Sequence, residues 1–177
     1  MALYGFARFS ARQVARGVGY SVGTIYNVFP SLDHFLLAIN TRTFELWTGH
    51  LLSRLEAAGP DRIRALVEAY FSFARENPNL WMAIYDHRLP VGMKMPEEAF
   101  QSRAELTGIV VREIAAVVGD RPLEEIQHLA RSLIATVHGH CTFDLNGTFA
   151  LMGESDPVGM ALDRVRQSLA ERATDLR

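Results

Sequence analysis

The chain has 177 residues, of which 49% are hydrophobic and 21% are charged, and its formal net charge is −2. This length and balance are typical of a globular protein with one or two domains, and they exclude a disordered or fibrous chain. No apolar run reaches the ~18 residues that would predict a membrane span.

Residues 1–8 lack the basic start, long apolar stretch and cleavage site of a signal peptide, so we expect a cytoplasmic protein. A single cysteine, Cys141, cannot form an internal disulfide, which agrees with a reducing compartment. We expect Cys141 to be a small core residue rather than a nucleophile.

Charge is distributed unevenly along the chain. The first thirty residues carry Arg8, Arg12 and Arg16 and no acidic residue, and Lys94 is the only lysine in the sequence. The N-terminal end is therefore the part of the chain expected to bind a polyanion. Contacts with phosphates there would come from arginine side chains, backbone amides and hydroxyls.

Apolar residues recur at spacings of three and four, and alternating strand-type runs are absent, which predicts an all-α fold. Ser10 and Ser21 stand where N-caps belong. They predict a short helix ending near Gly17 and a second one ending at Phe29, joined through Gly19.

Ser31 opens a long helix that ends at Gly59 and Pro60. Further along the chain, helical periodicity alternates with proline and glycine breaks. The remaining predicted helices cover residues 61–77, about 80–86, 96–118, 123–146 and 157–173, with a loop at 87–95.

Residues 9–29 have the pattern of a helix-turn-helix. Ala15 is small enough for a second helix to cross closely, Gly19 gives the backbone freedom of a sharp turn, and Ile25 with Phe29 can bury one face of the second helix. The residues left exposed on that helix are small or neutral and polar, which suits a recognition helix in the major groove. On spacing alone, the alternative is a helical hairpin with no role in DNA binding.

The same stretch resembles the DNA-binding module of the TetR family of repressors. The residues that carry the resemblance are Val14-Ala15, Gly19, Ser21, Val22-Gly23, Thr24-Ile25, Tyr26, Phe29 and Pro30-Ser31. His138-Gly139, inside a long predicted helix, is similar to the His-Gly pair of the WHG type of TetR C-terminal domain. Glycine is costly within a helix, so Gly139 is expected to permit a close helix contact or ligand approach.

The resemblance implies an all-α protein with an N-terminal helix-turn-helix module in residues 1–40, whose first helix is shorter than the family's. A larger helical domain for ligand binding and dimerisation would occupy residues 41–177. Thr24 and Tyr26 would be expected to contact phosphates. The full set of expected DNA-binding residues is Arg12, Ser21, Val22, Gly23, Thr24, Tyr26 and Asn27.

The resemblance also implies a ligand pocket and a homodimer. Aromatic residues are dense in the middle helices, and we predict that the pocket is lined by Phe71, Trp81, Tyr85, Phe100 and His138. The alternative for each aromatic residue is ordinary core packing. The dimer interface is expected in the last two long helices, at Leu129, Leu133, Val158, Leu162, Val165 and Leu169.

An enzyme would need a site that the sequence does not supply. Glu125 and His128 have the spacing of a di-iron ligand pair, but no second pair is present. His138 and His140 would lie about 200° apart on a helix, too far round to share a metal ion. We therefore expect no enzymatic activity, no cofactor and no metal.

These features favour a transcriptional regulator, a repressor that is released from a palindromic double-stranded DNA operator by a small-molecule ligand. The alternative is a degenerate TetR-like dimer that binds a ligand or a partner but not DNA. Two departures from the family pattern keep that alternative open. Leu32 stands where the family usually has a lysine that meets phosphate, and residues 1–8 are shorter than the family's first helix and loop.

Overall fold

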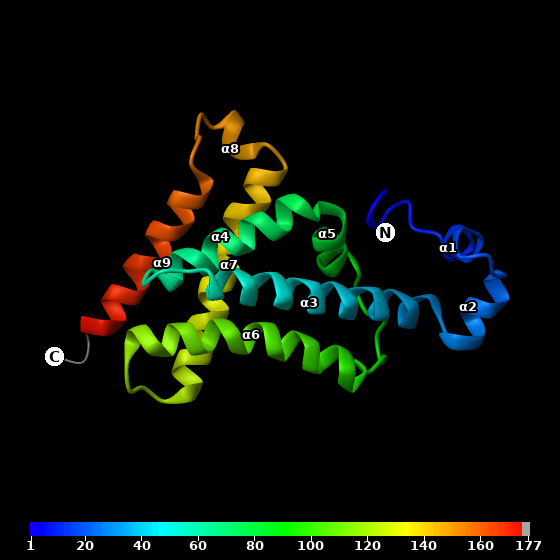
Figure 1. Ribbon diagram of the computed structural model, residues 1–177, viewed down its shortest axis with the longest axis horizontal. Coiled ribbons are helices and arrows are strands. Elements are labelled where there is room, and N and C mark those ends of the chain that lie inside the picture. The colour runs from blue at the N-terminus through cyan, green and yellow to red at the C-terminus, as the bar shows by residue number, and fades with distance from the viewer. Residues whose placement is uncertain (175–177) are drawn as a thin grey trace. The chain divides into compact units, whose positions relative to one another are not determined.

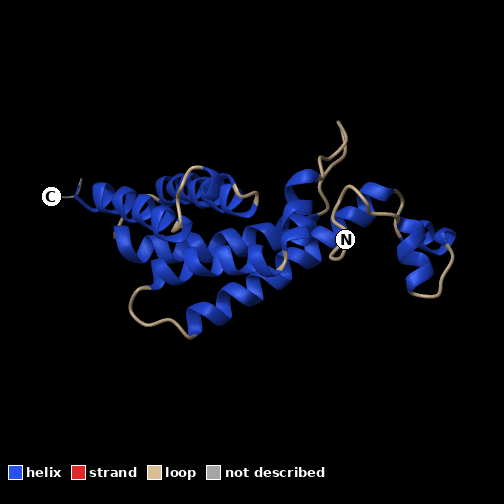
Figure 2. Ribbon diagram, turned by 90° about the horizontal axis from the view of Figure 1, so that it is seen from above, coloured by secondary structure: helices blue, strands red, loops and turns tan. Residues whose placement is uncertain are grey.

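The computed structural model describes residues 1–174, which form helices and loops without a strand (Figure 2). The helices are α1 (Ala11–Gly17), α2 (Val22–Val28), α3 (Leu32–Glu56), α4 (Arg62–Glu76), α5 (Pro78–Asp86), α6 (Glu97–Val118), α7 (Leu123–Leu145), α8 (Thr148–Leu151) and α9 (Pro157–Thr174) (Figure 1). The predicted all-α fold is confirmed. Among these described helices, none combines the length and apolar character that crossing a membrane requires.

The helices differ from the predicted ones by more than one residue at three places. Helix α3 ends at Glu56, three positions before the predicted end at Gly59. Helix α5 begins at Pro78, two positions before the predicted start, because proline lacks an N–H and fits the first turn of a helix. Helix α8 was not predicted, since a single turn is too short to show an apolar period. It follows Gly147, whose φ of 76° is left-handed, and the Asn146 side chain accepts a hydrogen bond from the Thr148 backbone N–H at 3.0 Å.

The chain divides into two compact units. The first contains Met1–Trp47 and Asn77–Ala104, and the second contains Thr48–Glu76 and the described residues from Glu105 onward. The first unit therefore holds α1, α2, the start of α3, α5 and the start of α6. The boundary predicted at residue 40 concerns where the helix-turn-helix module ends, and it stays a prediction.

In the second unit, α7 packs against α9, α4 and α8, and α4 also packs against α9. One face of α4 is buried, including Leu66, Val67 and Phe71. Two ion pairs add polar links between helices: Arg62 donates to both carboxylate oxygens of Glu113 at 2.6 Å, and Arg75 donates to Asp144 at 2.8 Å. The hydrogen bonds from Arg62 lower the pKa of Glu113, which keeps this carboxylate charged.

Cys141 is fully buried on α7, so its interpretation as a core residue is confirmed. Burial disfavours the charged thiolate and raises the pKa of Cys141 to about 12. We expect iodoacetamide to label Cys141 very slowly in the native protein at pH 8 and rapidly in urea, because the thiolate is the nucleophile. Mass spectrometry of timed samples measures both rates, and fast labelling of the native protein would contradict the burial.

Candidate nucleic-acid interface

Two short helices with serine caps form the candidate interface. The Ser10 hydroxyl oxygen accepts a hydrogen bond from the Gln13 backbone N–H at 3.4 Å, and Ser21 accepts one from the Thr24 backbone N–H at 3.2 Å. Both serines have extended backbone, as N-cap residues do. The predicted caps are confirmed, and they set where α1 and α2 begin.

The turn between these helices depends on Gly19. Its φ is 79°, in the left-handed region that favours glycine. The next residue, Tyr20, donates its backbone N–H to the Ala15 carbonyl at 2.8 Å, which closes the end of α1. Ala15 is 1% exposed, and α1 and α2 contact each other. The predicted turn and the predicted inward position of Ala15 are therefore both present.

Aromatic side chains join this module to the start of α3. The ring of Phe35 lies 5.5 Å from that of Phe9 and 4.8 Å from that of Phe29, measured between centroids, and Phe35 is buried. Ile25 and Phe29 are half-buried, and α2 has no fully buried residue. The predicted burial of the inner face of α2 is thus only partial, and the Phe9–Phe35–Phe29 contacts provide apolar cover.

The first turn of α3 is fixed by two histidine contacts. The Ser31 hydroxyl lies 2.8 Å from Nδ1 of His34. Farther along the chain, the His87 side chain is 4% exposed, and its Nε2 lies 3.1 Å from an Asp33 carboxylate oxygen. Nδ1 of His87 lies 3.5 Å from the Asn40 amide nitrogen. Sequence reasoning missed the Asp33–His87 contact, because 54 positions separate the two residues. This contact links the helix that follows the module to the segment after α5.

The predicted DNA-binding residues all lie on this module, but they are not equally available. Val22 and Thr24 are half-buried. The Thr24 hydroxyl lies 3.0 Å from the Ser21 hydroxyl, so these two hydroxyl groups form a hydrogen bond with each other. Tyr26 is 46% exposed. The full set of exposed members is Arg12, Ser21, Gly23, Tyr26 and Asn27. The groups best placed to reach a nucleic acid are therefore the Tyr26 hydroxyl, the Asn27 amide and the Arg12 guanidinium.

The predicted ligand-pocket residues fall in both units: Trp81, Tyr85 and Phe100 in the first, Phe71 and His138 in the second. Trp81 and Phe71 are fully buried, as core residues are, and the Trp81 ring meets the Tyr85 ring edge-on at 5.2 Å. Phe100 is 60% exposed, so it does not line an enclosed cavity. The structure thus favours core packing for Phe71 and Trp81.

His138 is half-buried on α7, and its Nδ1 lies 3.1 Å from the Tyr70 hydroxyl of α4. Burial lowers the pKa of His138, so the imidazole is neutral at pH 7. The neighbouring Gly139 is exposed, and a Cβ placed there would meet no atom of the chain within 4 Å. The close contact expected at Gly139 is therefore not made within the described chain.

Most of the apolar stripe predicted to form the dimer interface is buried within the described chain. Leu133 of α7 and Leu162, Val165 and Leu169 of α9 are buried, and α7 packs against α9. Leu129 and Val158 are half-buried. A second copy would have to meet other side chains of α7 and α9 while this packing holds.

A capped helix-turn-helix joined to a helical domain defines a class of protein, the helix-turn-helix regulators. A family profile described as "Tetracyclin repressor-like, C-terminal domain" matches residues 63–166, more than half of the chain. The chain therefore belongs to the TetR family of transcriptional regulators, and the resemblance seen in the sequence is confirmed. The matched range includes His138 and Gly139, while the WHG subtype stays a prediction.

Individual relatives agree with this assignment. The nucleoid occlusion factors SlmA of Actinobacillus pleuropneumoniae serotype 5b (strain L20) and serotype 3 (strain JL03) are each 29% identical over 87 residues. These residues are 48% of this chain and 43% of each relative, so the chain spans less than half the length of the curated relatives it matches.

Two solved structures share the fold over nearly the whole chain. A protein of unknown function from Rhodococcus sp. RHA1 is 25% identical with a TM-score of 0.75, and the match covers 95% of this chain and 88% of that one. The crystal structure of SCO4313 is 19% identical with a TM-score of 0.71 and the same coverage. The likeness to SCO4313 shows the fold alone.

Proposed function

We propose that the chain is a DNA-binding transcriptional regulator, a repressor that leaves a palindromic operator when a small molecule binds, and that it is not an enzyme. The observation that carries this proposal is the module of two serine-capped helices around Gly19, which leaves Tyr26, Asn27 and Arg12 exposed. Membership of the TetR family supports it.

The chemistry of the module suits a duplex. Arg12 and Arg16 lie on α1, and the first thirty residues contain no acidic residue that would repel phosphates. The Tyr26 hydroxyl can donate a hydrogen bond to a phosphate oxygen, and the Asn27 amide can donate and accept at a base edge. Phosphate contacts would fix the register of the module, and base contacts would give sequence specificity.

Replacing Tyr26 by alanine tests this proposal. We expect affinity for duplex DNA from around the chain's own gene to fall by about tenfold to a hundredfold, because hydrogen bonds to charged groups contribute about 1.5–3 kcal/mol. Fluorescence anisotropy at one fixed salt concentration measures the change. Tyr4→Ala is the matched control, since Tyr4 is also exposed and lies outside α1 and α2. Equal binding by wild type and Tyr26→Ala would contradict the proposal.

We also propose that the regulator is a homodimer whose copies meet through an exposed face of α7. Ala135, Gly139 and Phe143 are exposed and spaced four residues apart, so they lie along one side of the helix. The alanine and the glycine would let the backbone of a second α7 approach closely, and Phe143 would supply apolar area. This face replaces the buried stripe as the candidate interface.

A charge at Gly139 tests the dimer. We expect Gly139→Arg to be monomeric at micromolar concentration where the wild type is dimeric, as measured by sedimentation velocity. Its helix should persist, because arginine forms helices more readily than glycine. Ala116→Arg is the control, at an exposed position of α6. A monomeric wild type, or a dimeric Gly139→Arg, would rule out this interface.

A second candidate function is a dimeric binding protein that does not bind DNA. One observation favours it: Val18 and Val28 of the module are 57% and 67% exposed, and Leu32 at the start of α3 is 41% exposed. An apolar surface of this kind suits a protein partner better than a phosphate backbone. A dimer that shows no duplex binding at low salt would favour this second function.

A further inference from the structure

His50 of α3 lies against α4 in the second unit, where its ring is largely buried. Its side chain is 17% exposed, and its ring centroid lies 5.7 Å from that of Phe73. Nε2 of His50 lies 2.8 Å from the Ser72 hydroxyl, which is a direct contact between side chains of the two helices. These residues belong neither to the helix-turn-helix module nor to the proposed dimer face, so the proposals above leave the contact unexplained.

The hydrogen bonds of Ser72 assign the proton on the His50 ring. A hydroxyl has one hydrogen, and Ser72 donates its hydrogen to the Ala69 carbonyl at 3.2 Å. The Ser72 oxygen therefore accepts from His50, which places the proton of the neutral ring on Nε2. Nδ1 of His50 then carries a lone pair and no hydrogen.

The unprotonated Nδ1 of His50 faces a carboxylate. It lies 4.0 Å from Oε2 of Glu76, beyond hydrogen-bond distance, while Oε1 of Glu76 lies 3.8 Å from an Arg54 guanidinium nitrogen. A lone pair and a carboxylate repel each other, whereas a protonated Nδ1 would donate to the same oxygen. Glu76 of α4 and Arg54 of α3 are the charged groups that act on the ring. Protonation of His50 would thus turn a repulsive contact into an ion pair.

Burial opposes that protonation. Desolvation is the largest effect and lowers the pKa of His50 from its usual value of 6.5, while Glu76 raises this pKa, Arg54 lowers it and a hydrogen bond to the Ala69 backbone raises it. The net pKa is lowered, so the ring is neutral at pH 7. Because the unfolded chain binds this proton more readily, the contribution of His50 to stability is complete above about pH 6.5 and is lost as the pH falls.

We propose that His50 makes the α3–α4 junction an acid-sensitive switch, in which an added proton draws Glu76 from Arg54 to Nδ1 and destabilises the fold. The proton comes from solvent, which reaches the partly exposed ring. At neutral pH the uncharged ring joins the two helices through Ser72. In acid the ring holds a charge that is largely removed from water, and the contact with Glu76 offsets only part of that cost. The switch lies outside the helix-turn-helix module, so its test requires no DNA.

Nuclear magnetic resonance with isotope-labelled histidine tests the tautomer and the titration. At pH 8 we expect the His50 ring to carry its proton on Nε2. On acidification we expect the ring to titrate at a lower pH in the folded protein than in the urea-unfolded chain. His50→Gln assigns the resonance, because its spectrum lacks that ring. A proton on Nδ1 at pH 8, or titration at the same or a higher pH than in urea, would overturn the proposal.

Two charge variants test the exchange of partners. Glu76→Gln should shift the titration of His50 to lower pH, because the carboxylate that favours the charged ring is lost. Arg54→Gln should shift it to higher pH, since a repelling charge is removed and Glu76 is released. Both replaced side chains are more than half exposed, so both variants should fold, which circular dichroism checks. Shifts in the same direction, or no shift in either variant, would contradict the exchange.

Urea unfolding at about pH 7 and about pH 5 tests the consequence for stability. The urea midpoint of the wild type should fall on acidification by more than that of His50→Gln, because glutamine can donate an amide hydrogen to Ser72 but does not titrate. Burial also lowers the pKa of His138, so both proteins should lose stability in acid, and the difference between them isolates His50.

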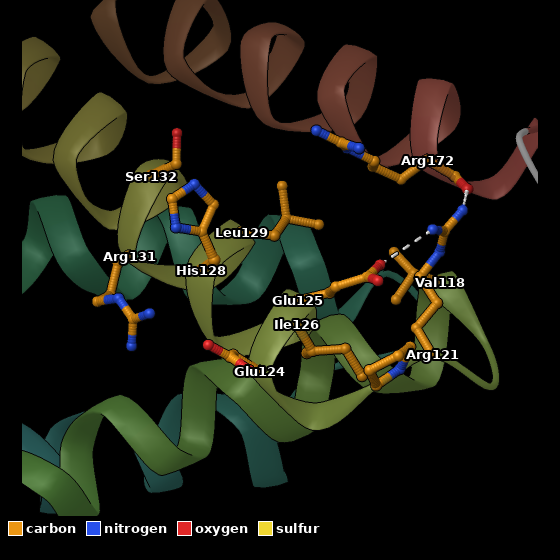
Figure 3. Close-up of a pocket in the computed structure, with 11 residues that line it drawn as sticks. Val118, Arg121, Glu124, Glu125, Ile126, His128, Leu129, Arg131, Ser132 and Arg172 are labelled. Atoms are coloured by element: carbon orange, nitrogen blue, oxygen red, sulfur yellow. Dashed lines mark hydrogen bonds and ion pairs between the residues drawn. The ribbon is translucent and has the colours of Figure 1, made fainter.

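His128→Gln is the matched control for this comparison. His128 is exposed and lines a surface cleft beside α7 (Figure 3), so its replacement should leave the wild-type pH dependence unchanged. An equal loss of stability in the wild type and in His50→Gln, or an equal effect of the two histidine variants, would overturn the proposal.

Discussion

Replacing Phe71 by alanine is expected to lower the free energy of unfolding by about 3–5 kcal/mol, the usual cost of deleting a buried phenyl ring. Phe71 is 1% exposed on α4, which packs against both α7 and α9. The cavity left by the ring would lie where α4, α7 and α9 pack against one another. Urea unfolding followed by circular dichroism measures the change.

Phe100→Ala is the matched control for this substitution. Both phenylalanines were predicted to line the ligand pocket, but Phe100 is 60% exposed. Its replacement should change the free energy of unfolding by less than about 1 kcal/mol, as is usual at a surface site. A Phe71→Ala variant as stable as Phe100→Ala would show that Phe71 is not a core residue.

The second large effect is expected at the turn of the helix-turn-helix. Gly19→Ala should destabilise the module by about 1–2 kcal/mol, because an L-residue at φ 79° is strained. No atom lies within 4 Å of the added Cβ, so the cost comes from the backbone alone. Hydrogen exchange of the backbone amides in residues 11–28 measures local stability, and DNA affinity should fall with it.

Gly17→Ala gives the opposite expectation for the same chemical change. Gly17 is the last residue of α1, and a Cβ there also meets no atom within 4 Å. Its φ is not positive, so alanine should stabilise the helix by about 0.5–1 kcal/mol. If Gly17→Ala and Gly19→Ala both slow or both accelerate hydrogen exchange, the left-handed backbone at Gly19 does not explain the effect of replacing it.

Local signals made the module and most helices predictable. A serine cap acts on an amide three positions away, and a left-handed glycine acts on its own backbone, so both can be read from a few residues. Ser10, Ser21 and Gly19 all have the predicted roles. The long helices were predictable because their apolar periods extend over many turns.

Which surfaces meet could not be predicted from the sequence. The stripe containing Leu162 and Val165 shows that α9 packs against another helix, but its period is the same whether that helix belongs to the same chain or to a second copy. Likewise, aromatic residues such as Phe71 are common in cores and in pockets alike. The Asp33–His87 contact joins distant parts of the chain and leaves no local signal.

A salt titration of duplex binding tests the central claim most directly. The DNA should come from around the chain's own gene and be compared with a scrambled duplex. Specific binding that weakens steeply with salt is expected, and Arg12→Gln should reduce the slope of log affinity against log salt by about 0.9, the loss of one phosphate contact. Binding that is absent at low salt, or that neither falls with salt nor distinguishes the two duplexes, would contradict a DNA-reading regulator.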